Sequence, residues 1–291
     1  MASVIPVPAS ASQAVLAATI IAAAWLTFVG VTPPRNPSSS SEAAADAAGK
    51  PDTKTNNDKK ANKRKSPDDF IRSINLTTRF GPSLVFSHIA FFAAYTAFLA
   101  YNFDPAAQSL RLSPGTRSWA APYCSLPPPT TTKPFGSNNN GLNPSLLSWH
   151  PFVFLPLSII ILIGAPLRLI PYSALAQNFT FALAEPDRLV TTGIYGLVQH
   201  PSYTGLAALF FGNSVLYYRY DTPMLACLVP PEWYPWVKMF VLGFIWPSFV
   251  LAGVFGISVR VRQEERMLKD KFGREWVEWH TKTARFIPGV F

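Results

Sequence analysis

The sequence predicts an all-α fold, a multi-spanning integral membrane helical bundle of about five transmembrane helices. Of its 291 residues, 49% are hydrophobic and only 14% are charged, whereas soluble domains carry about 25% charged residues. The charges gather in residues 50–72 and 259–285, and long stretches between them carry almost none. An ion in hydrocarbon costs several kcal/mol, so this distribution is typical of a membrane protein.

A membrane-crossing helix requires about 20 mostly apolar residues. Five stretches of differing strength fit this requirement: Val15–Val31, Pro82–Tyr101, Trp149–Ile170, Tyr203–Tyr218 and Val237–Val259.

The first span also resembles a signal peptide. Residues Met1–Ala14 contain no Lys or Arg, whereas a signal peptide normally begins with a positively charged region. We therefore expect a retained membrane helix, with cleavage after the small residues near Ala22–Ala24 as the alternative.

Positive charge predicts the orientation of the spans. Loop 32–81 carries ten Lys and Arg residues, loop 102–148 carries three, and the tail from Arg260 carries eight. Cytosolic segments are the ones enriched in Lys and Arg. The first loop and the tail are thus expected in the cytosol, and the N-terminus in the lumen. Cys124 and Cys227 then both lie on the lumenal side, where either a disulfide or two free thiols is compatible with the sequence.

Four regions follow from the composition. Residues 1–31 form an N-terminal membrane helix, and residues 32–81 form a basic cytosolic linker. The linker is expected to be disordered, because Pro37–Asp68 contains too few apolar side chains to offset the entropy of an ordered chain. Residues 82–164 hold the second and third membrane helices with a lumenal loop, and residues 165–291 hold the region expected to carry the chemistry.

The net charge of +9 does not predict a nucleic-acid partner. The basic residues flank apolar spans, where they set orientation and contact anionic lipid headgroups. The alternation of aromatic and basic residues that single-strand binding requires is missing from the sequence. The two cysteines have no metal-ligand spacing, so no metal is expected.

The segment Leu189–Gly205 reads as a loop that leads into a membrane helix. Pro201 suits the first helical turn, which places His200 near the N-cap. Gly205 leaves a bare patch where a ligand or another backbone can approach, and free N–H groups at a helix start favour an anion. The alternative is that His-Pro only starts the helix and that Tyr203 anchors it at the membrane interface.

The segment Arg260–His280 has helical periodicity. One stripe holds the apolar residues Val261, Leu268, Phe272 and Trp279. Glu264 and Glu265 lie within this stripe, and carboxylates on an apolar side need a partner. A cationic ligand is one such partner. The alternative is that they are solvated or paired with Lys269 and Lys271.

Together the two segments resemble the isoprenylcysteine carboxyl methyltransferase family. That family's first motif resembles L-V-T-x-G-x-Y-x-x-x-R-H-P-S-Y-x-G, and this chain follows it from Leu189 to Gly205 with Gln199 in place of the Arg. Matches to the second motif are Arg260, Glu264, Glu265, Leu268, Phe272 and Gly273, with Trp276 in place of a Tyr. Arg168, Ala176 and Phe179 are similar to the family's approach helix, so the resemblance covers about residues 165–291.

The resemblance implies a methyltransferase that uses S-adenosyl-L-methionine at the cytosolic face of the endoplasmic reticulum. The implied acceptor is the C-terminal carboxylate of a prenylated protein or a small prenylcysteine, reached from the membrane lipid. The implied cofactor contacts are Asp187, Arg188, Leu189, Val190, Tyr195, His200, Pro201, Ser202, Tyr203 and Glu264. Arg260 is implied to hold the substrate carboxylate.

Two alternatives stay open at this level. The first is a membrane methyltransferase that acts on another lipid or on a terpenoid acid or amine. Gln199 favours it, because this residue lacks the permanent charge and the bidentate fork of an Arg. The second is a reductase-like or non-catalytic membrane protein with the same fold.

Overall fold

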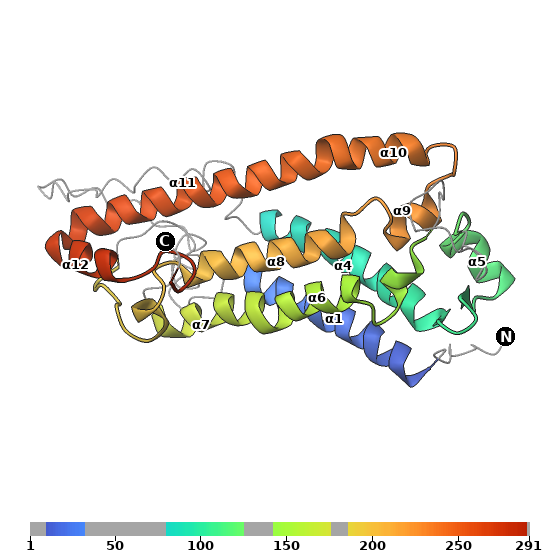
Figure 1. Cartoon of the computed structure of the whole chain (residues 1–291), viewed down its shortest axis with the longest axis horizontal. Helices are drawn as coiled ribbons and strands as arrows, with labels where there is room; N and C mark the ends of the chain where they lie inside the picture. Colours follow the sequence, from blue (N-terminus) through green and yellow to red (C-terminus); the bar gives the residue numbers. More distant parts are fainter. Residues whose placement is uncertain (1–9, 33–79, 125–141, 176–185, 290–291) are drawn as a thin grey trace, which may run out of the picture.

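The computed structural model describes residues 10–32, 80–124, 142–175 and 186–289 (Figure 1). Most of the predicted linker lies outside these ranges, as do Ala176 and Phe179 of the approach helix. The helices that coincide with the predicted spans or adjoin them are α1 (Ala11–Val31), α4 (Phe80–Asn102), α6 (Pro151–Ser158), α7 (Ala165–Leu175), α8 (Pro201–Tyr217), α10 (Tyr234–Phe240) and α11 (Trp246–Phe272). The remaining helices and strands are β1 (Phe103–Asp104), β2 (Ser109–Leu110), α5 (Pro114–Ala120), η1 (Pro144–Leu147), η4 (Gly193–Gly196), α9 (Pro223–Leu228) and α12 (Arg274–Lys282). Two π-helical turns, η2 (Ile159–Gly164) and η5 (Val241–Ile245), join α6 to α7 and α10 to α11.

Within the described residues, three helical runs are long and apolar enough to cross a membrane. They are Ala11–Val31, Pro151–Tyr172 and Tyr234–Phe272. The first and last of these contain the first and fifth predicted spans, and the second overlaps the third predicted span, which was expected to begin two residues earlier, at Trp149. The chain is therefore an integral membrane protein. The second and fourth predicted spans correspond to α4 and α8, which are helical but present shorter apolar stretches, so the count of five stays a prediction.

Two details refine the sequence expectation. The fold includes a small antiparallel hairpin in which Phe103 pairs with Leu110, so it is not purely α-helical. The fifth predicted span, Val237–Val259, lies inside a longer helical run, because α11 continues to Phe272. Residues 257–272 contain neither Gly nor Pro to interrupt the helix. The chain turns at Gly273, whose φ of 53° favours glycine, and α12 follows.

Close backbone packing places α8 against α7. A Cβ added at Gly205 would lie 2.6 Å from the backbone nitrogen of Arg168 and 2.8 Å from the carbonyl carbon of Leu167. The bare patch predicted at Gly205 is therefore filled by another backbone. Gly212 likewise faces Ile160, because a Cβ added at Gly212 would lie 2.6 Å from Cγ1 of Ile160. Small residues thus let these helices approach closely, as is common between membrane helices.

Buried polar side chains tie α1 to the rest of the bundle. The amide nitrogen of Gln13 donates to the carbonyl oxygens of Phe103 (3.1 Å) and Leu147 (2.8 Å). Further along the same helix, the Thr27 hydroxyl oxygen accepts from the side-chain amide of Asn213 at 3.0 Å. In hydrocarbon such groups need internal partners, so these contacts fix how α1 lies against β1, η1 and α8.

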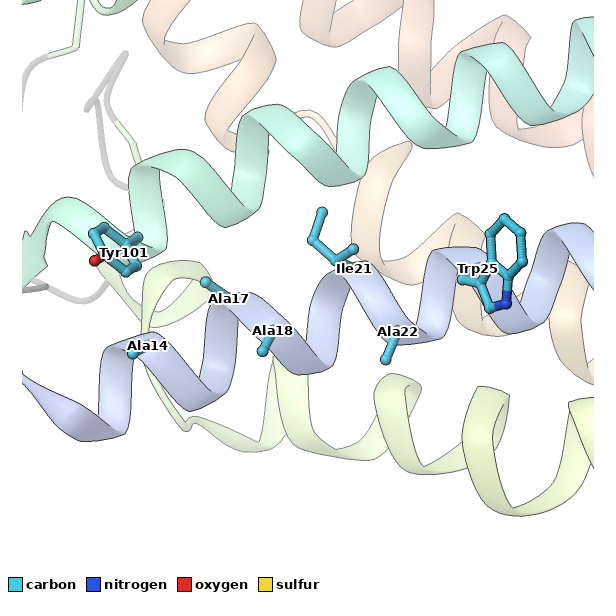
Figure 2. A pocket seen from close by; sticks show the side chains of 7 residues that line it. All are labelled: Ala14, Ala17, Ala18, Ile21, Ala22, Trp25 and Tyr101. Atoms are coloured by element: carbon cyan, nitrogen blue, oxygen red, sulfur yellow. The ribbon is translucent and has the colours of Figure 1, made fainter. Parts of the chain in front are cut away.

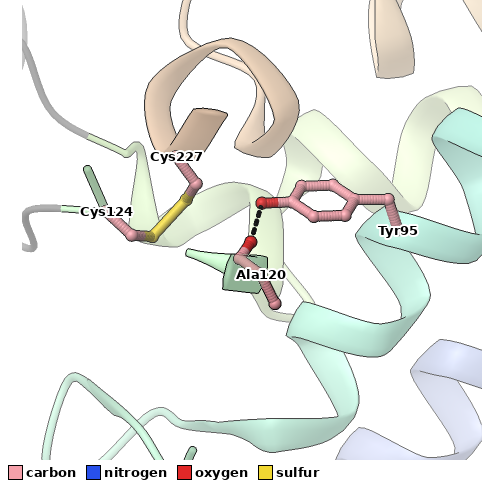
Figure 3. The surroundings of a disulfide bond; sticks show 4 residues. All are labelled: Tyr95, Ala120, Cys124 and Cys227. Atoms are coloured by element: carbon pink, nitrogen blue, oxygen red, sulfur yellow. Dashed lines mark hydrogen bonds between the residues drawn. A yellow bond between two sulfur atoms is a disulfide. The ribbon is translucent and has the colours of Figure 1, made fainter. Parts of the chain in front are cut away.

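Figure 1 shows that the two ends of the bundle carry different features. The start of α8 and the helix α12 lie at one end, and α5 and α9 lie at the other. At the α5–α9 end, Cys124 and Cys227 form a disulfide between segments 103 residues apart in sequence (Figure 3). Nearby, Tyr95 of α4 donates to the carbonyl oxygen of Ala120 at 2.7 Å. Of the two alternatives that the sequence left open for these cysteines, the structure has the disulfide.

Replacing Cys124 by Ser is expected to lower the free energy of unfolding by about 2 kcal/mol. A disulfide stabilises mainly by restricting the unfolded chain. The expected loss is at the lower end of the usual range, because membrane insertion already restricts the spans. Thermal unfolding of the purified protein measures it, and adding a reductant to the unchanged protein is expected to give the same shift. An unchanged midpoint in both cases would contradict the stabilising role of the bond.

An open apolar hollow lies along α1 and the end of α4 (Figure 2). It is lined by Ala14, Ala17, Ala18, Ile21, Ala22, Trp25 and Tyr101. Its lining is almost entirely apolar and contributes none of the predicted site residues. We therefore build the functional site from the motif segments.

Candidate functional site

The first motif feeds directly into α8. His200 is the N-cap residue of this helix and Pro201 occupies its first turn, as the sequence predicted. Proline is suited to this position because the N–H that it lacks would have no partner within the helix. His200 and Gln199 are both buried, so their polar atoms face protein groups rather than open solvent.

One hydrogen-bonded chain joins the two motifs. Arg260 Nε of α11 donates to the phenol oxygen of Tyr203 at 3.3 Å. The Tyr203 hydroxyl in turn donates to Glu264 Oε2 at 2.8 Å. Arg260 is 5% exposed. The structure thus brings together the predicted substrate residue and two of the predicted cofactor residues across the seam between α8 and α11.

The neighbouring carboxylate, Glu265, is enclosed by two different partners. His200 Nε2 lies 3.3 Å from Glu265 Oε1, and Arg285 Nη2 lies 2.7 Å from Oε2. Each carboxylate oxygen therefore has its own partner. The two glutamates are thus held by Tyr203, His200 and Arg285, rather than by Lys269 and Lys271, the pairing that was one alternative from the sequence.

Gln199 fastens the C-terminal segment to the first motif. Its side-chain amide donates to the carbonyl oxygen of His280 at 3.0 Å and to that of Thr283. Its amide oxygen lies 2.7 Å from His280 Nδ1. Since that oxygen only accepts, His280 carries its proton on Nδ1. A guanidinium has no acceptor, so Gln199 makes a contact here that an Arg at this position would not make.

Burial changes the proton affinity of two groups at this end of the bundle. Burial lowers the pKa of the His280 imidazole, which favours the neutral form that bonds to Gln199. Burial also raises the pKa of Tyr195, and the negative charge of Glu264 raises it further. Trp279 Nε1 donates to the Tyr195 backbone oxygen at 2.9 Å, so α12 and η4 are held together.

Replacing Gln199 by Leu is expected to loosen the C-terminal segment. The change leaves the partly buried His280 nitrogen and two backbone oxygens without their partner, and the buried one of these, the Thr283 oxygen, costs about 1–3 kcal/mol when it is left unsatisfied. Hydrogen exchange of residues 280–286 is expected to speed up by at least about tenfold. The reverse change at the exposed Leu197, Leu197→Gln, serves as a control and should leave this exchange unaltered. Equal protection in both variants would contradict the role given to Gln199.

The remaining predicted residues occupy different surroundings. The Ser202 hydroxyl accepts a hydrogen bond from Arg168 Nη1 of α7, which also packs near Gly205. Asp187 and Arg188 are exposed, while Leu189 and Val190 are partly buried in the segment before η4. Their part in cofactor binding stays a prediction.

Sequence reasoning missed His280 and Arg285. Both lie beyond the last residue of the second motif, Trp276, where the resemblance assigns no role to any residue. Glu265 was noticed as a carboxylate on the apolar stripe, but its partners were not foreseen. Arg285 reaches Glu265 only because the chain turns back after α12, and a turn of this kind leaves no periodic signal in the sequence.

Comparison with known proteins gives two kinds of match. Residues 156–242 match the family model described as phospholipid methyltransferase. Protein-S-isoprenylcysteine O-methyltransferase B of Arabidopsis thaliana is 25% identical over 134 residues, which cover 45% of this chain and 56% of that protein. Protein-S-isoprenylcysteine O-methyltransferase of Dictyostelium discoideum is 26% identical over 137 residues, which cover 46% and 48%.

The resemblance to isoprenylcysteine carboxyl methyltransferases is confirmed. The similarity spans about half the length of these curated relatives. The matched family model includes His200 and Tyr203 and ends before Arg260 and Glu264. No solved structure matches the chain.

Proposed function

We propose that this protein transfers a methyl group from S-adenosyl-L-methionine to the C-terminal carboxylate of a prenylated cysteine. The acceptor is a prenylated protein or a small prenylcysteine, and residues 165–291 form the catalytic region. The observation that carries the proposal is the chain from Arg260 through Tyr203 to Glu264. It places a cation suited to a carboxylate beside an anion suited to a cationic donor.

The residues at this end of the bundle fit a sulfonium donor. Such a donor carries positive charge at its sulfonium and its amino group. Glu264 offers a carboxylate, while the rings of Tyr195 and Tyr203 offer aromatic faces for the cation or the adenine. His200 to Tyr203 and Asp187 to Val190 complete the proposed donor contacts. When bound, the donor supplies an activated methyl group.

The chain's own residues act mainly by holding and aligning. Carboxyl groups are ionised near pH 7, so the acceptor needs no general base. Arg260 holds the acceptor carboxylate, and its own burial keeps that contact away from water. Alignment of two reactants is worth several kcal/mol, about 7–11 at its upper end. In this proposal His200 binds the donor and does not remove a proton.

The seam between α8 and α11 supports a hydrocarbon substrate. The two helices touch at Tyr203 and Arg260, and again where Phe210 stacks on Phe249 at 4.0 Å. Between these contacts Ala207 is exposed, and a Cβ at Gly256 would meet no atom within 4 Å. A prenyl chain leaves Arg260 through this opening toward the lipid, where each buried CH₂ contributes about 0.8 kcal/mol.

The proposed site faces the cytosol, and the membrane is that of the endoplasmic reticulum. The disulfide supports this orientation, since disulfides persist in oxidising compartments and this one lies at the opposite end of the bundle (Figure 1). The eight Lys and Arg residues from Arg260 onward support it independently. The choice of the endoplasmic reticulum follows the resemblance alone.

The direct test uses membranes that contain the protein, methyl-labelled donor and a farnesylated cysteine analogue. We expect base-labile methyl ester on the analogue, and none on the same compound with a carboxamide in place of its carboxylate. Donor binding without ester formation would overturn the substrate assignment. Absence of donor binding would overturn the methyltransferase assignment itself.

A second candidate acceptor is a phospholipid amine. The match of residues 156–242 to the phospholipid methyltransferase model favours it. Arg260 opposes it, because a guanidinium repels a protonated amine and offers it no acceptor. Adding phosphatidylethanolamine vesicles to the same assay decides between them, since label in the lipid headgroup and not in the prenylcysteine would establish the second candidate.

A further inference from the structure

The C-terminal segment after α12 lies directly against the first motif. Val198 and Ala284 form a parallel bridge, and the hydroxyl of Thr204 donates to the backbone oxygen of Phe286 at 2.9 Å. The segment therefore follows the loop up to and into the first turn of α8. It forms a third wall of the proposed donor site, next to α8 and α11.

Arg285 is the charged residue of this wall. Its backbone oxygen accepts from the N–H of His200 at 2.9 Å. Its guanidinium bonds to Glu265 at 2.7 Å, and its side chain is 45% exposed. The side chain of Glu265 is 10% exposed and that of His200 only 3%. Arg285, Glu265 and His200 thus form a row of three bonded charged or ionisable groups. Arg285 lies at its solvent-exposed end, and His200 lies at its buried end inside the proposed site.

The two partners of Glu265 are not equivalent. A buried carboxylate without compensation is costly. Histidine compensates it by charge only when protonated, whereas a guanidinium is permanently charged. Arg285 therefore keeps Glu265 ionised and fixes one of its oxygens. The other oxygen then holds His200 Nε2, and this hydrogen bond sets the orientation of the imidazole.

We infer that Arg285 is a positioning residue of the donor site, which acts through Glu265 on His200. This inference rests on the proposed function, because it assumes that His200 contacts the methyl donor. It assigns a role to a residue outside both sequence motifs. It also makes the C-terminal segment a part of the donor site, instead of a tail that follows it.

The test is the affinity of the full-length purified protein for labelled S-adenosylmethionine, measured for Arg285→Gln and Arg285→Lys. We expect Gln to raise the donor Kd about tenfold, which is the loss of one hydrogen bond to a charged group. Lys should restore most of the affinity, because a single nitrogen makes the contact and a point charge suffices. The KM for the prenylcysteine acceptor should change far less than the donor Kd.

Arg274→Gln is the matched control. Arg274 also pairs with a glutamate, Glu278 at 2.8 Å, but its side chain is 92% exposed. This variant should bind the donor like the unchanged protein, since exposed pairs contribute little. The unfolding midpoint is measured for all variants without donor.

Three outcomes would overturn the inference. The first is equal donor affinity in Arg285→Gln and the unchanged protein; the proposed function survives this result. The second is a loss of affinity that tracks a lowered unfolding midpoint and that Lys does not restore, which makes Arg285 a stability residue only. The third is failure of the unchanged protein to bind the donor, which removes the proposed function and the inference together.

Discussion

Arg260→Gln is expected to lower kcat/KM for the prenylcysteine acceptor about 100-fold. Arg260 is 5% exposed and bonded to Tyr203, so its charge acts where water screens little. Truncating one partner of a buried charged pair costs about 2–5 kcal/mol, and 2.7 kcal/mol corresponds to about 100-fold. Steady-state assays with labelled donor measure this loss. The donor Kd should change far less, because Arg260 is assigned to the acceptor.

Arg262→Gln provides the matched control for this prediction. Arg262 lies two residues further along the same helix, but its side chain is exposed. Both changes remove one positive charge from the same end of α11, so the two variants are matched in charge. The control should keep its kcat/KM, because the exposed Arg262 is not assigned to the acceptor. If the two variants lose activity equally, the effect is general electrostatics and Arg260 is not the carboxylate residue. If Arg260→Gln loses donor affinity instead, Arg260 belongs to the donor contacts.

The positions of the membrane helices were predictable because they depend on composition. Apolar runs of sufficient length have few alternatives in a chain that is poor in charge. The helix start at His200 and Pro201 was also predictable, because proline restricts the choices there. Hydropathy reports where charge begins and not where a helix ends, so the fifth predicted span lies inside a helix, α11, that continues through its charged residues to Phe272.

The site was predictable only as far as its motifs reach. The resemblance to isoprenylcysteine carboxyl methyltransferases implied a shared site for Tyr203, Arg260 and Glu264, and the structure places them in one hydrogen-bonded chain. The contacts of Gln199 and Arg285 depend on how the chain folds back after α12. Gln199 was noticed as a departure from the family, whereas its partner His280 became visible only in three dimensions.

Helix packing close to the site could not be read from sequence either. Gly205 was expected to admit a ligand or a backbone, and the structure shows that a backbone fills the space. The packed α7 carries Arg168, which bonds to the Ser202 hydroxyl and to the backbone oxygen of Gly30 at 2.9 Å. The first turn of α8 is therefore supported by α7 and α1 from one side and by α11 from the other.

Gly205→Leu is consequently expected to destabilise the protein by at least about 4 kcal/mol. Overpacking a dense interior usually costs about 1–3 kcal/mol. The cost should be larger here, because the added Cβ alone would lie 2.6–2.9 Å from three backbone atoms of α7 and η2, and backbone atoms cannot rotate away. Separation of α7 from α8 would also break the Arg168–Ser202 contact. The yield and the unfolding midpoint of the purified protein measure the effect.

Gly256→Leu is the matched variant with which the stability of Gly205→Leu is compared. Gly256 also lies inside a membrane helix, but a Cβ there meets no atom within 4 Å. This variant should fold at least as well as the unchanged protein, since leucine favours helix over glycine by roughly 0.5–1 kcal/mol. It should nevertheless lower activity toward prenylcysteine, because Gly256 borders the opening between α8 and α11. Equal stability of the two variants would contradict the close packing at Gly205, and full activity of Gly256→Leu would contradict the proposed route of the prenyl chain.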